Sequence, residues 1–214
     1  MMMLRMRTRC AASATRSRAC LFAVVIAVGL IDLAGCSSQN TSAPSPPAPS
    51  AAPSAVAPSV PLAAAYHSPD GYSISPPDGW VLHPTTGQQG LSVVFAATTV
   101  DAAAQKPFAN NLNVVVTPTP DTLDSLISQA KQQSPGLLPN YTVVTDQPVT
   151  LADGQPAHLL GAIYDQQGTG SLENIQLLLV DAGKEYTITF TSPAASFDSY
   201  HDLAQASLAS FTLG

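Results

Sequence analysis

The chain has 214 residues, of which 45% are hydrophobic and only 10% are charged, and its formal net charge is −6 at pH 7. All its arginines precede residue 19, so that from Cys36 onward three lysines stand against 13 acidic residues, a net charge of −10. So acidic a surface repels the phosphates of nucleic acids and the headgroups of anionic lipids, which excludes a nucleic-acid partner and a basic membrane-binding patch.

Residues 1–35 have the two-part form of a signal peptide. Residues 1–20 contain arginines and no acidic residue, and Leu21–Ile31 then form an uncharged apolar run of 11 residues. A helix that spans the bilayer core needs about 20 apolar residues. The run therefore predicts a targeting segment that is removed after export, not a permanent transmembrane anchor.

The segment Leu33-Ala34-Gly35-Cys36 resembles the lipobox of bacterial lipoproteins. That resemblance implies cleavage before Cys36 and attachment of a diacylglyceryl group to its thiol, since a thiolate is the nucleophile that forms a thioether. Two or three acyl chains, at ~0.8 kcal/mol per buried methylene, hold a protein firmly on a membrane. We expect an exported protein, anchored through Cys36 to the outer face of the cytoplasmic membrane. An ordinary secretory peptide that happens to contain Cys36 is the alternative.

The other two cysteines, Cys10 and Cys20, lie in the leader, so the folded part has no disulfide, thiol nucleophile or cysteine metal site. Residues 36–65 consist almost entirely of Ser, Ala, Pro and Thr without a charge, a composition that cannot bury a core. We interpret them as the acylated cysteine and a disordered tether. Residues 66–214 have the commonest size of one domain.

The first half of this domain is predicted to contain strands and then a helix. Apolar and β-branched runs bounded by turn residues predict strands at Leu91–Ala97 and Leu112–Thr117, after a short extended piece at Tyr72–Ser75. A helix follows, because Leu123, Leu126, Ile127 and Ala130 recur at helical spacing. Its predicted start has Thr119 as cap, Pro120 as first helical residue and Asp121 near the positive end, and its predicted end is near Gln133, before Pro135-Gly136.

The second half is predicted to be a block of strands closed by a helix. Turn signals separate four strands: Tyr141–Leu151, with Pro148 indicating a bulge or an edge, Ala157–Tyr164, Glu173–Val180 and Lys184–Thr191. In the last strand, apolar residues alternate with Thr187, Thr189 and Thr191, so one face is expected in the core and the other against water or a partner. The final helix is expected from Phe197 to Phe211, capped by Ser196.

This order predicts an α+β domain, with a central antiparallel sheet flanked by helices. Four features in this order resemble the PsbP/Mog1-like superfamily: Pro77–Trp80, Gly154–Ala157 opening a strand to Tyr164, Tyr186–Thr189, and a last helix after Phe197. With the lipobox and the Pro-rich segment, the chain is similar to LpqN/LpqT-type lipoproteins of mycobacteria. The resemblance implies an α/β/α sandwich that binds macromolecules as an assembly or accessory factor, and it brings no catalytic residue.

Candidate site residues are few. Four histidines could serve as bases or metal ligands, but their spacing matches no helix-borne metal pair: His67, His83, His158 and His201. No Gly-x-Ser-x-Gly elbow is present, so no catalytic residue, metal or cofactor is predicted. Trp80, the only tryptophan, and Tyr164 are candidate binding residues because rigid aromatics concentrate interface energy. Packing in the core is the alternative for both, and Tyr200 is weighed in the same way.

The sequence thus favours a non-enzymatic, lipid-anchored envelope protein that binds a protein partner or an envelope lipid or glycolipid. The alternative is a carrier of an apolar ligand such as a lipid, which would need a large apolar cavity between helix and sheet.

Overall fold

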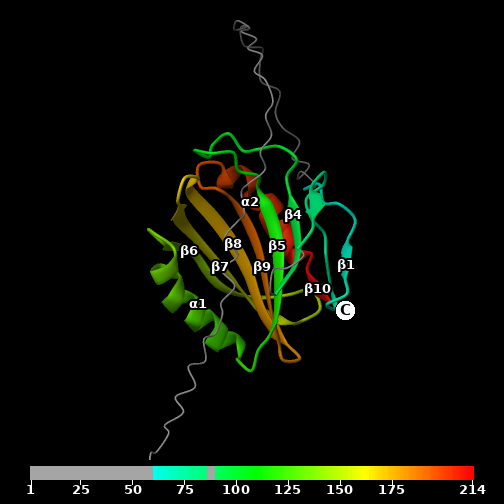
Figure 1. Cartoon of the computed structure of the whole chain (residues 1–214). Coiled ribbons are helices and arrows are strands. Elements are labelled where there is room, and N and C mark those ends of the chain that lie inside the picture. Colours follow the sequence, from blue (N-terminus) through cyan, green and yellow to red (C-terminus); the bar gives the residue numbers. More distant parts are fainter. Residues whose placement is uncertain (1–59, 86–89) are drawn as a thin grey trace, which may run out of the picture.

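The computed structural model describes residues 60–85 and 90–214. The predicted signal peptide, Cys36 and most of the predicted tether lie outside the described residues. The elements, shown in Figure 1, are β1 (Tyr66–Ser68), β2 (Tyr72–Ile74), β3 (Val81–His83), β4 (Leu91–Ala96), β5 (Asn111–Pro118), α1 (Leu123–Leu137), β6 (Thr142–Thr150), β7 (Pro156–Gln166), β8 (Gly170–Asp181), β9 (Lys184–Pro193), α2 (Phe197–Ala209) and β10 (Thr212–Leu213). Backbone pairing begins just before β1, where the Ala63 amide donates to the Pro76 carbonyl at 2.8 Å.

Seven strands form one antiparallel sheet in the order β3-β4-β5-β9-β8-β7-β6, and β1, β2 and β10 form a small second sheet. Hairpins build most of the large sheet. The β8–β9 turn has Ala182 and Gly183 at φ 45° and 76°, the two positive angles that a tight hairpin turn requires. The α+β class with a central antiparallel sheet is confirmed.

The two helices pack on opposite faces of the large sheet, as β8 shows. Leu177 and its alternate neighbours belong to the main core with Leu208 of α2, whereas Leu178 packs with Leu126 and Ala130 of α1. Because side chains alternate along a strand, this division assigns the odd residues of β8 to the α2 face and the even ones to the α1 face. In Figure 1, α1 lies in front of the sheet and α2 behind it.

Aromatic rings join the small sheet to the α2 face. Tyr72 stacks on Phe211 with 5.3 Å between ring centroids, and Tyr186 packs edge-on against both rings. Such pairs contribute about 0.5–1.5 kcal/mol each beyond their buried area. The small sheet therefore closes the α2 face at the β4 and β5 side.

Helix α1 differs from its predicted limits at both ends. Its N-cap is Thr122, whose Oγ1 accepts from the Ser125 amide at 3.3 Å, while Thr119 Oγ1 accepts from the Asp121 amide in a local turn. The predictions of Thr119 as the cap and Pro120 as the first helical residue were wrong. A threonine hydroxyl can accept from the amide two residues later in a local turn without capping a helix. The helix also continues through Pro135, since a proline in the last turn removes only one backbone hydrogen bond.

The threonine face of β9 is not exposed to water. Thr187, Thr189 and Thr191 are only 8%, 5% and 3% exposed, and the Gln176 amide donates to Thr189 Oγ1 at 3.1 Å. Because β9 is the central strand, its neighbours β5 and β8 flank these short side chains. Helix α2 begins at Phe197 as predicted, but Ser196 makes no side-chain cap bond and donates instead to Asp101 at 2.7 Å.

Candidate binding groove

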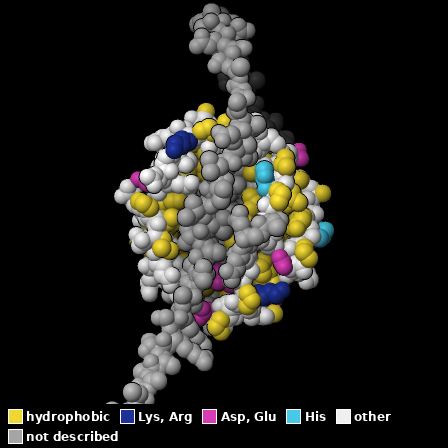
Figure 2. Space-filling model, in the orientation of Figure 1, with side chains coloured by type: hydrophobic (Ala, Val, Ile, Leu, Met, Phe, Trp, Pro, Cys, Tyr) yellow, Lys and Arg dark blue, Asp and Glu magenta, His cyan; other side chains and the backbone are white. Residues whose placement is uncertain are grey.

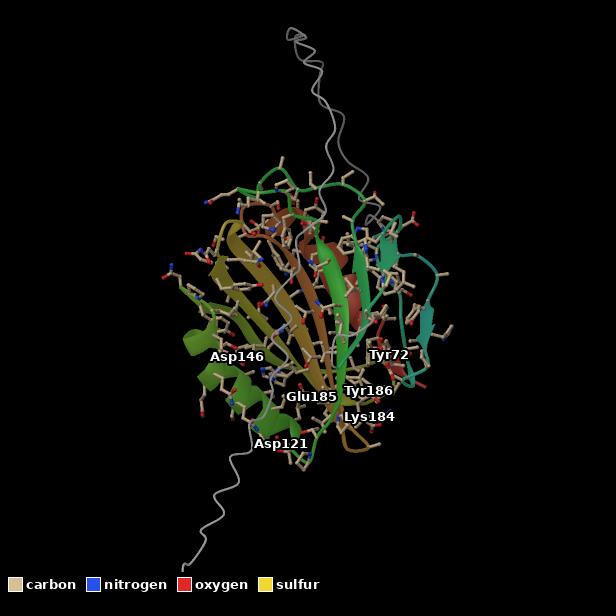
Figure 3. All side chains as sticks on the ribbon, in the orientation of Figure 1. Tyr72, Asp121, Asp146, Lys184, Glu185 and Tyr186 are labelled. Atoms are coloured by element: carbon tan, nitrogen blue, oxygen red, sulfur yellow. The ribbon has the colours of Figure 1, made fainter. Side chains whose placement is uncertain are left out.

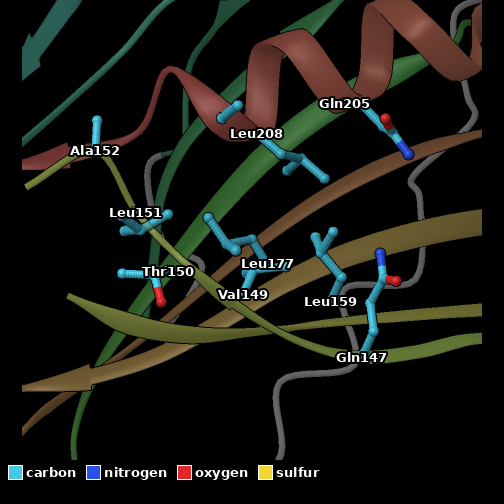
Figure 4. Close-up of a pocket in the computed structure, with 10 residues that line it drawn as sticks. Gln147, Val149, Thr150, Leu151, Ala152, Leu159, Leu177, Gln205 and Leu208 are labelled. Carbon is cyan, nitrogen blue, oxygen red and sulfur yellow. The ribbon is translucent and has the colours of Figure 1, made fainter. Parts of the chain in front are cut away.

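A cavity of about 380 Å³ opens between α2 and strands β6, β7 and β8 (Figure 4). We call it the α2 groove. Its lining is mainly aliphatic and comprises Gln147, Val149, Thr150, Leu151, Ala152, Leu159, Leu177, Gln205, Leu208 and Ala209. Ligand sites typically have volumes of about 300–1,000 Å³ and combine an apolar wall with a few polar groups. The α2 groove has this form.

The floor of the groove is set by strand register. Gln147 of β6 pairs with Leu159 of β7, which pairs with Leu177 of β8, so the three residues form a row across the sheet. Helix α2 contacts β8 and β9 and provides Gln205 and Leu208 as the opposite wall. The sheet extends beyond the helix by β7 and β6, and this overhang leaves the groove open.

Two amide side chains, those of Gln147 and Gln205, line the groove. Gln205 Nε2 lies 3.1 Å from His201 Nε2, one helical turn toward the start of α2. Desolvation raises the pKa of Glu173 on β8, the negative charge of Asp198 raises it further, and His201 acts in the opposite direction. Neither Glu173 nor Asp198 lines the groove.

Strand β6 forms the outer wall of the groove and the edge of the sheet, as Pro148 predicted. Seven of its nine residues are exposed, including Val143 and Val144 at 38% and 47%. A bulge between Val143 and Thr145 interrupts its pairing with β7. An edge strand with apolar side chains presents unpaired backbone groups on which an extended segment can pair.

An ionic cluster holds this edge to α1. Asp146 of β6, labelled in Figure 3, accepts hydrogen bonds from Lys131 of α1 and, at 2.7 Å, from His158 Nε2 of β7. These two hydrogen bonds lower the pKa of the Asp146 carboxyl, and the bond from Lys131 has the larger effect. The arrangement ties a helix to an edge strand and brings no nucleophile to the histidine.

Two other polar networks connect elements. Tyr72 donates to Ser92 Oγ at 2.8 Å and Ser92 donates to Asp70, which links β2 to β4. Burial raises the pKa of Tyr72 to about 12, so this hydroxyl keeps its proton at neutral pH. On the α1 face, desolvation first raises the pKa of Glu185, and the nearby charge of Asp121 adds to the effect (Figure 3).

The predicted binding residues lie elsewhere. Trp80 is partly buried and its ring lies 5.4 Å from that of Phe190 in the main core. Tyr164 is 6% exposed, packs with Phe108 and Leu172, and has a pKa raised by burial to about 12. The structure brings neither ring into the α2 groove, and their binding roles stay predictions, as does lipidation of Cys36, which lies outside the described residues.

The four histidines are spread over the fold. His158 and His201 are described above, and His67 Nδ1 lies 2.9 Å from Ser73 Oγ on the small sheet. Within residues 60–85 and 90–214, no three His, Cys, Asp or Glu side chains gather as a metal site would require. In the same ranges neither helix is long and apolar enough to cross a membrane.

Sequence reasoning missed the groove. Leu159, Leu177 and Leu208 have the spacing of core residues, and nothing in their pattern distinguishes a groove floor from a filled core. The overhang of β6 beyond α2 depends on strand order, which the sequence alone did not give.

Comparison with known proteins identifies the family. A DcrB family model matches residues 95–210, more than half of the chain. The chain belongs to the DcrB family. The matched region runs from β4 to the end of α2, so every residue lining the α2 groove of this DcrB-family chain lies within it. No curated protein sequence matches the chain.

Solved structures show the fold. Cyanobacterial PsbP from Synechocystis sp. PCC 6803 is 16% identical, has a TM-score of 0.55 and is covered over 98% of its length by 76% of this chain. This likeness confirms the predicted PsbP-like fold. A protein of unknown function from Pseudomonas aeruginosa is 12% identical, with a TM-score of 0.49 and coverage of 70% of this chain and 94% of that one. LpqN of Mycobacterium tuberculosis, described as involved in cell envelope biogenesis, is 17% identical, with a TM-score of 0.47 and coverage of 66% and 82%.

Proposed function

We propose that this protein is a lipid-anchored lipoprotein of the cell envelope and a binding or accessory module without enzymatic activity. Its acylated Cys36 holds it on the outer face of the cytoplasmic membrane, and the Ser/Ala/Pro-rich segment separates the domain from the lipid. The form of residues 1–36 supports the anchoring. As a finer assignment, we propose an LpqN/LpqT-type lipoprotein, which rests on the order of the sequence motifs.

The α2 groove is the observation that supports a binding role. It combines an apolar floor, two amide side chains and an adjacent edge strand, Thr142–Thr150, in one surface. An edge strand offers backbone hydrogen bonds and a neighbouring pocket selects side chains, which is a recurring way to recognise protein segments. We therefore favour a protein partner over an envelope lipid or glycolipid.

Site-specific photocrosslinking in intact cells tests this role. A photoreactive amino acid replaces Gln147 at the groove or, as the matched control, exposed Gln132 of α1 on the opposite face. We expect one protein, identified by mass spectrometry, to crosslink from position 147 and not from 132. Cys36→Ser should abolish this product. Equal products from both positions, or none from 147, would contradict the proposal.

A carrier of an apolar ligand such as a lipid is the second candidate function. The volume of about 380 Å³ and the aliphatic lining favour it, although this volume lies near the lower limit for ligand sites. The test is extraction of the protein purified from its own membranes and mass spectrometry of the extract. A stoichiometric lipid that Val149→Lys removes would favour the carrier, and an extract without lipid would exclude it.

A further inference from the structure

The centre of the large sheet carries uncharged polar side chains on the face that α1 shares. Asn113 of β5 pairs with Thr189 of β9, which pairs with Gln176 of β8, so the three residues form a row across the sheet. Even residues of β8 face α1, and residues paired directly across strands point to the same side. A second row lies beside the first. We call both rows the polar face: Asn111, Asn113, Asn174, Gln176, Thr189 and Thr191.

No helix of the described chain lies over the middle of the polar face. Helix α1 packs against β7 and β8, and β5 and β9 lie to one side of it in Figure 1. The cover of the polar face is therefore not one of the described helices.

One buried acceptor on the polar face has no donor. The Asn113 side chain is 1% exposed, and its Nδ2 donates to Asn111 Oδ1 at a long 3.5 Å. No group of the described chain donates to Asn113 Oδ1. Beside it, Thr189 Oγ1 accepts from Gln176 at 3.1 Å and keeps its own proton to donate. Since buried polar groups are normally paired, these two atoms indicate a polar occupant above the sheet.

The polar face favours an uncharged occupant. None of its six side chains carries a charge, so an ionic group buried there would find no counter-charge. Figure 2 shows the same side of the molecule, with dark blue lysine side chains at two separate places near opposite ends of the domain. Residues 37–59 contain no charged residue and are mostly Ser, Ala and Pro, so they offer hydroxyl groups as donors and carbonyl groups as acceptors.

We propose that residues 37–59, which we call the strap, bind across the polar face of their own chain. A serine or threonine hydroxyl of the strap donates to Asn113 Oδ1, and a main-chain carbonyl accepts from Thr189. The inference goes beyond the proposed function, because it assigns a surface on the opposite side of the sheet from the α2 groove. A bound strap joins the α1 face to the anchored end of the chain and leaves the groove free for a partner.

The strap is long enough to reach this surface. Near the start of the described chain, Leu62 pairs with Pro77, and Val81 follows Pro77 by four residues. Val81 pairs with Ala96, and Ala96 pairs with Asn111 at one end of the polar face. Four extended residues and two strand spacings together span about 23 Å. As polyproline II, at about 3.1 Å per residue, the strap spans about 70 Å and can cross the whole polar face.

The test is photocrosslinking in the full-length lipoprotein, held in nanodiscs of zwitterionic lipid. A photoreactive amino acid replaces Ala48, Ala52 or Ala55 of the strap, one at a time, so that no hydroxyl group is removed. Protein of normal and of heavy isotope composition is mixed, and mass spectrometry identifies the joined peptides. We expect at least one position to join the strap to β5 or β9 within one chain. Products only between chains, products only with α2 or lipid, or no product would overturn the inference.

Two variants locate the contact. Asn113→Leu removes the unpaired acceptor and Thr189→Val removes the hydroxyl group with little change of shape, so each should lower the yield of the crosslink at least about threefold. Thr150→Val, the same change in the α2 groove on the opposite face, should leave the yield unchanged. Thermal unfolding shows which variants are folded. A wild-type yield in the folded variants would refute the contact.

The outcome is separable from that of the proposed function. A strap that does not bind the polar face leaves the role of the α2 groove standing, because the partner crosslinked from position 147 is detected independently. Absence of that partner would refute the binding role and leave the strap in place.

Discussion

Truncation of two leucines tests whether the α2 groove is open. Leu208 of α2 and Leu112 of β5 are both buried in the main core, at 1% and 0% exposure, but only Leu208 also lines the groove. Leu→Ala removes three carbons, and at about 0.8 kcal/mol each the transfer free energy lost is about 2.4 kcal/mol. At Leu112 an enclosed void adds a further cost, giving about 4–5 kcal/mol.

Leu208 is also buried, but because it borders the groove, part of the vacated space joins the groove and a smaller cost is added for an enclosed void. We expect Leu208→Ala to lower the free energy of unfolding by about 2.5 kcal/mol, roughly 2 kcal/mol less than Leu112→Ala. Urea titration at pH 7 measures the free energy of unfolding of both variants, provided that their m-values agree with that of the wild type. Costs that agree within about 0.5 kcal/mol would show that the groove is closed, and both binding proposals would lose their geometry.

Three further changes test other parts of the structure. A Cβ at Gly161 would lie 2.9 Å from Thr145 Cβ on the edge strand. Gly161→Ala should therefore lower the free energy of unfolding, measured by urea titration, by about 1–3 kcal/mol. Adding Thr145→Gly should restore part of this loss, whereas adding Thr145→Ser, which keeps the Cβ, should not. The hydrogen bond from Lys131 lowers the pKa of Asp146 below its ordinary value of 3.8, so its stabilisation is present above that pH and lost as pH falls through the folded-state pKa. The urea midpoints of wild type and Asp146→Asn should converge on acidification, and parallel pH profiles would refute this. Ala182 has a φ of 45°; Ala182→Asn should raise the thermal midpoint by the equivalent of about 0.5–1 kcal/mol, and an unchanged midpoint would show that the turn is not strained.

Local signals determined much of the fold. The Asp181-Ala182-Gly183 turn and the alternation of Tyr186, Ile188 and Phe190 predicted the β8–β9 hairpin, because a tight turn and a half-buried strand depend on adjacent residues. The apolar stripe of α1 was equally local. The start of the helix could not be predicted in this way. Thr119 and Thr122 both carry a hydroxyl suited to a cap, and only the folded chain shows that Thr122 is the one used.

Properties that depend on strand order were beyond the sequence pattern. Alternation in β9 predicts two unlike faces, but its threonines are buried because β9 is the central strand. The same limit applies to the groove: Leu159 and Leu177 are equally apolar whether or not a helix covers them. The sequence therefore predicts which residues face a given side of the sheet, while the positions of the helices decide which of those residues remain accessible.

The groove follows from the widths of the elements that must cover the sheet. Seven strands spaced by about 4.8 Å span about 29 Å between the outer strands, whereas one helix with its side chains is about 10 Å wide and covers about two strands. On the α2 face the helix covers β8 and β9, and the small sheet joined by Tyr72 and Phe211 closes the β4 and β5 side. The remaining width, over β7 and β6, has no further element of the described chain to cover it. An accessible binding surface beside α2 is therefore a consequence of placing one helix on this side of a seven-stranded sheet.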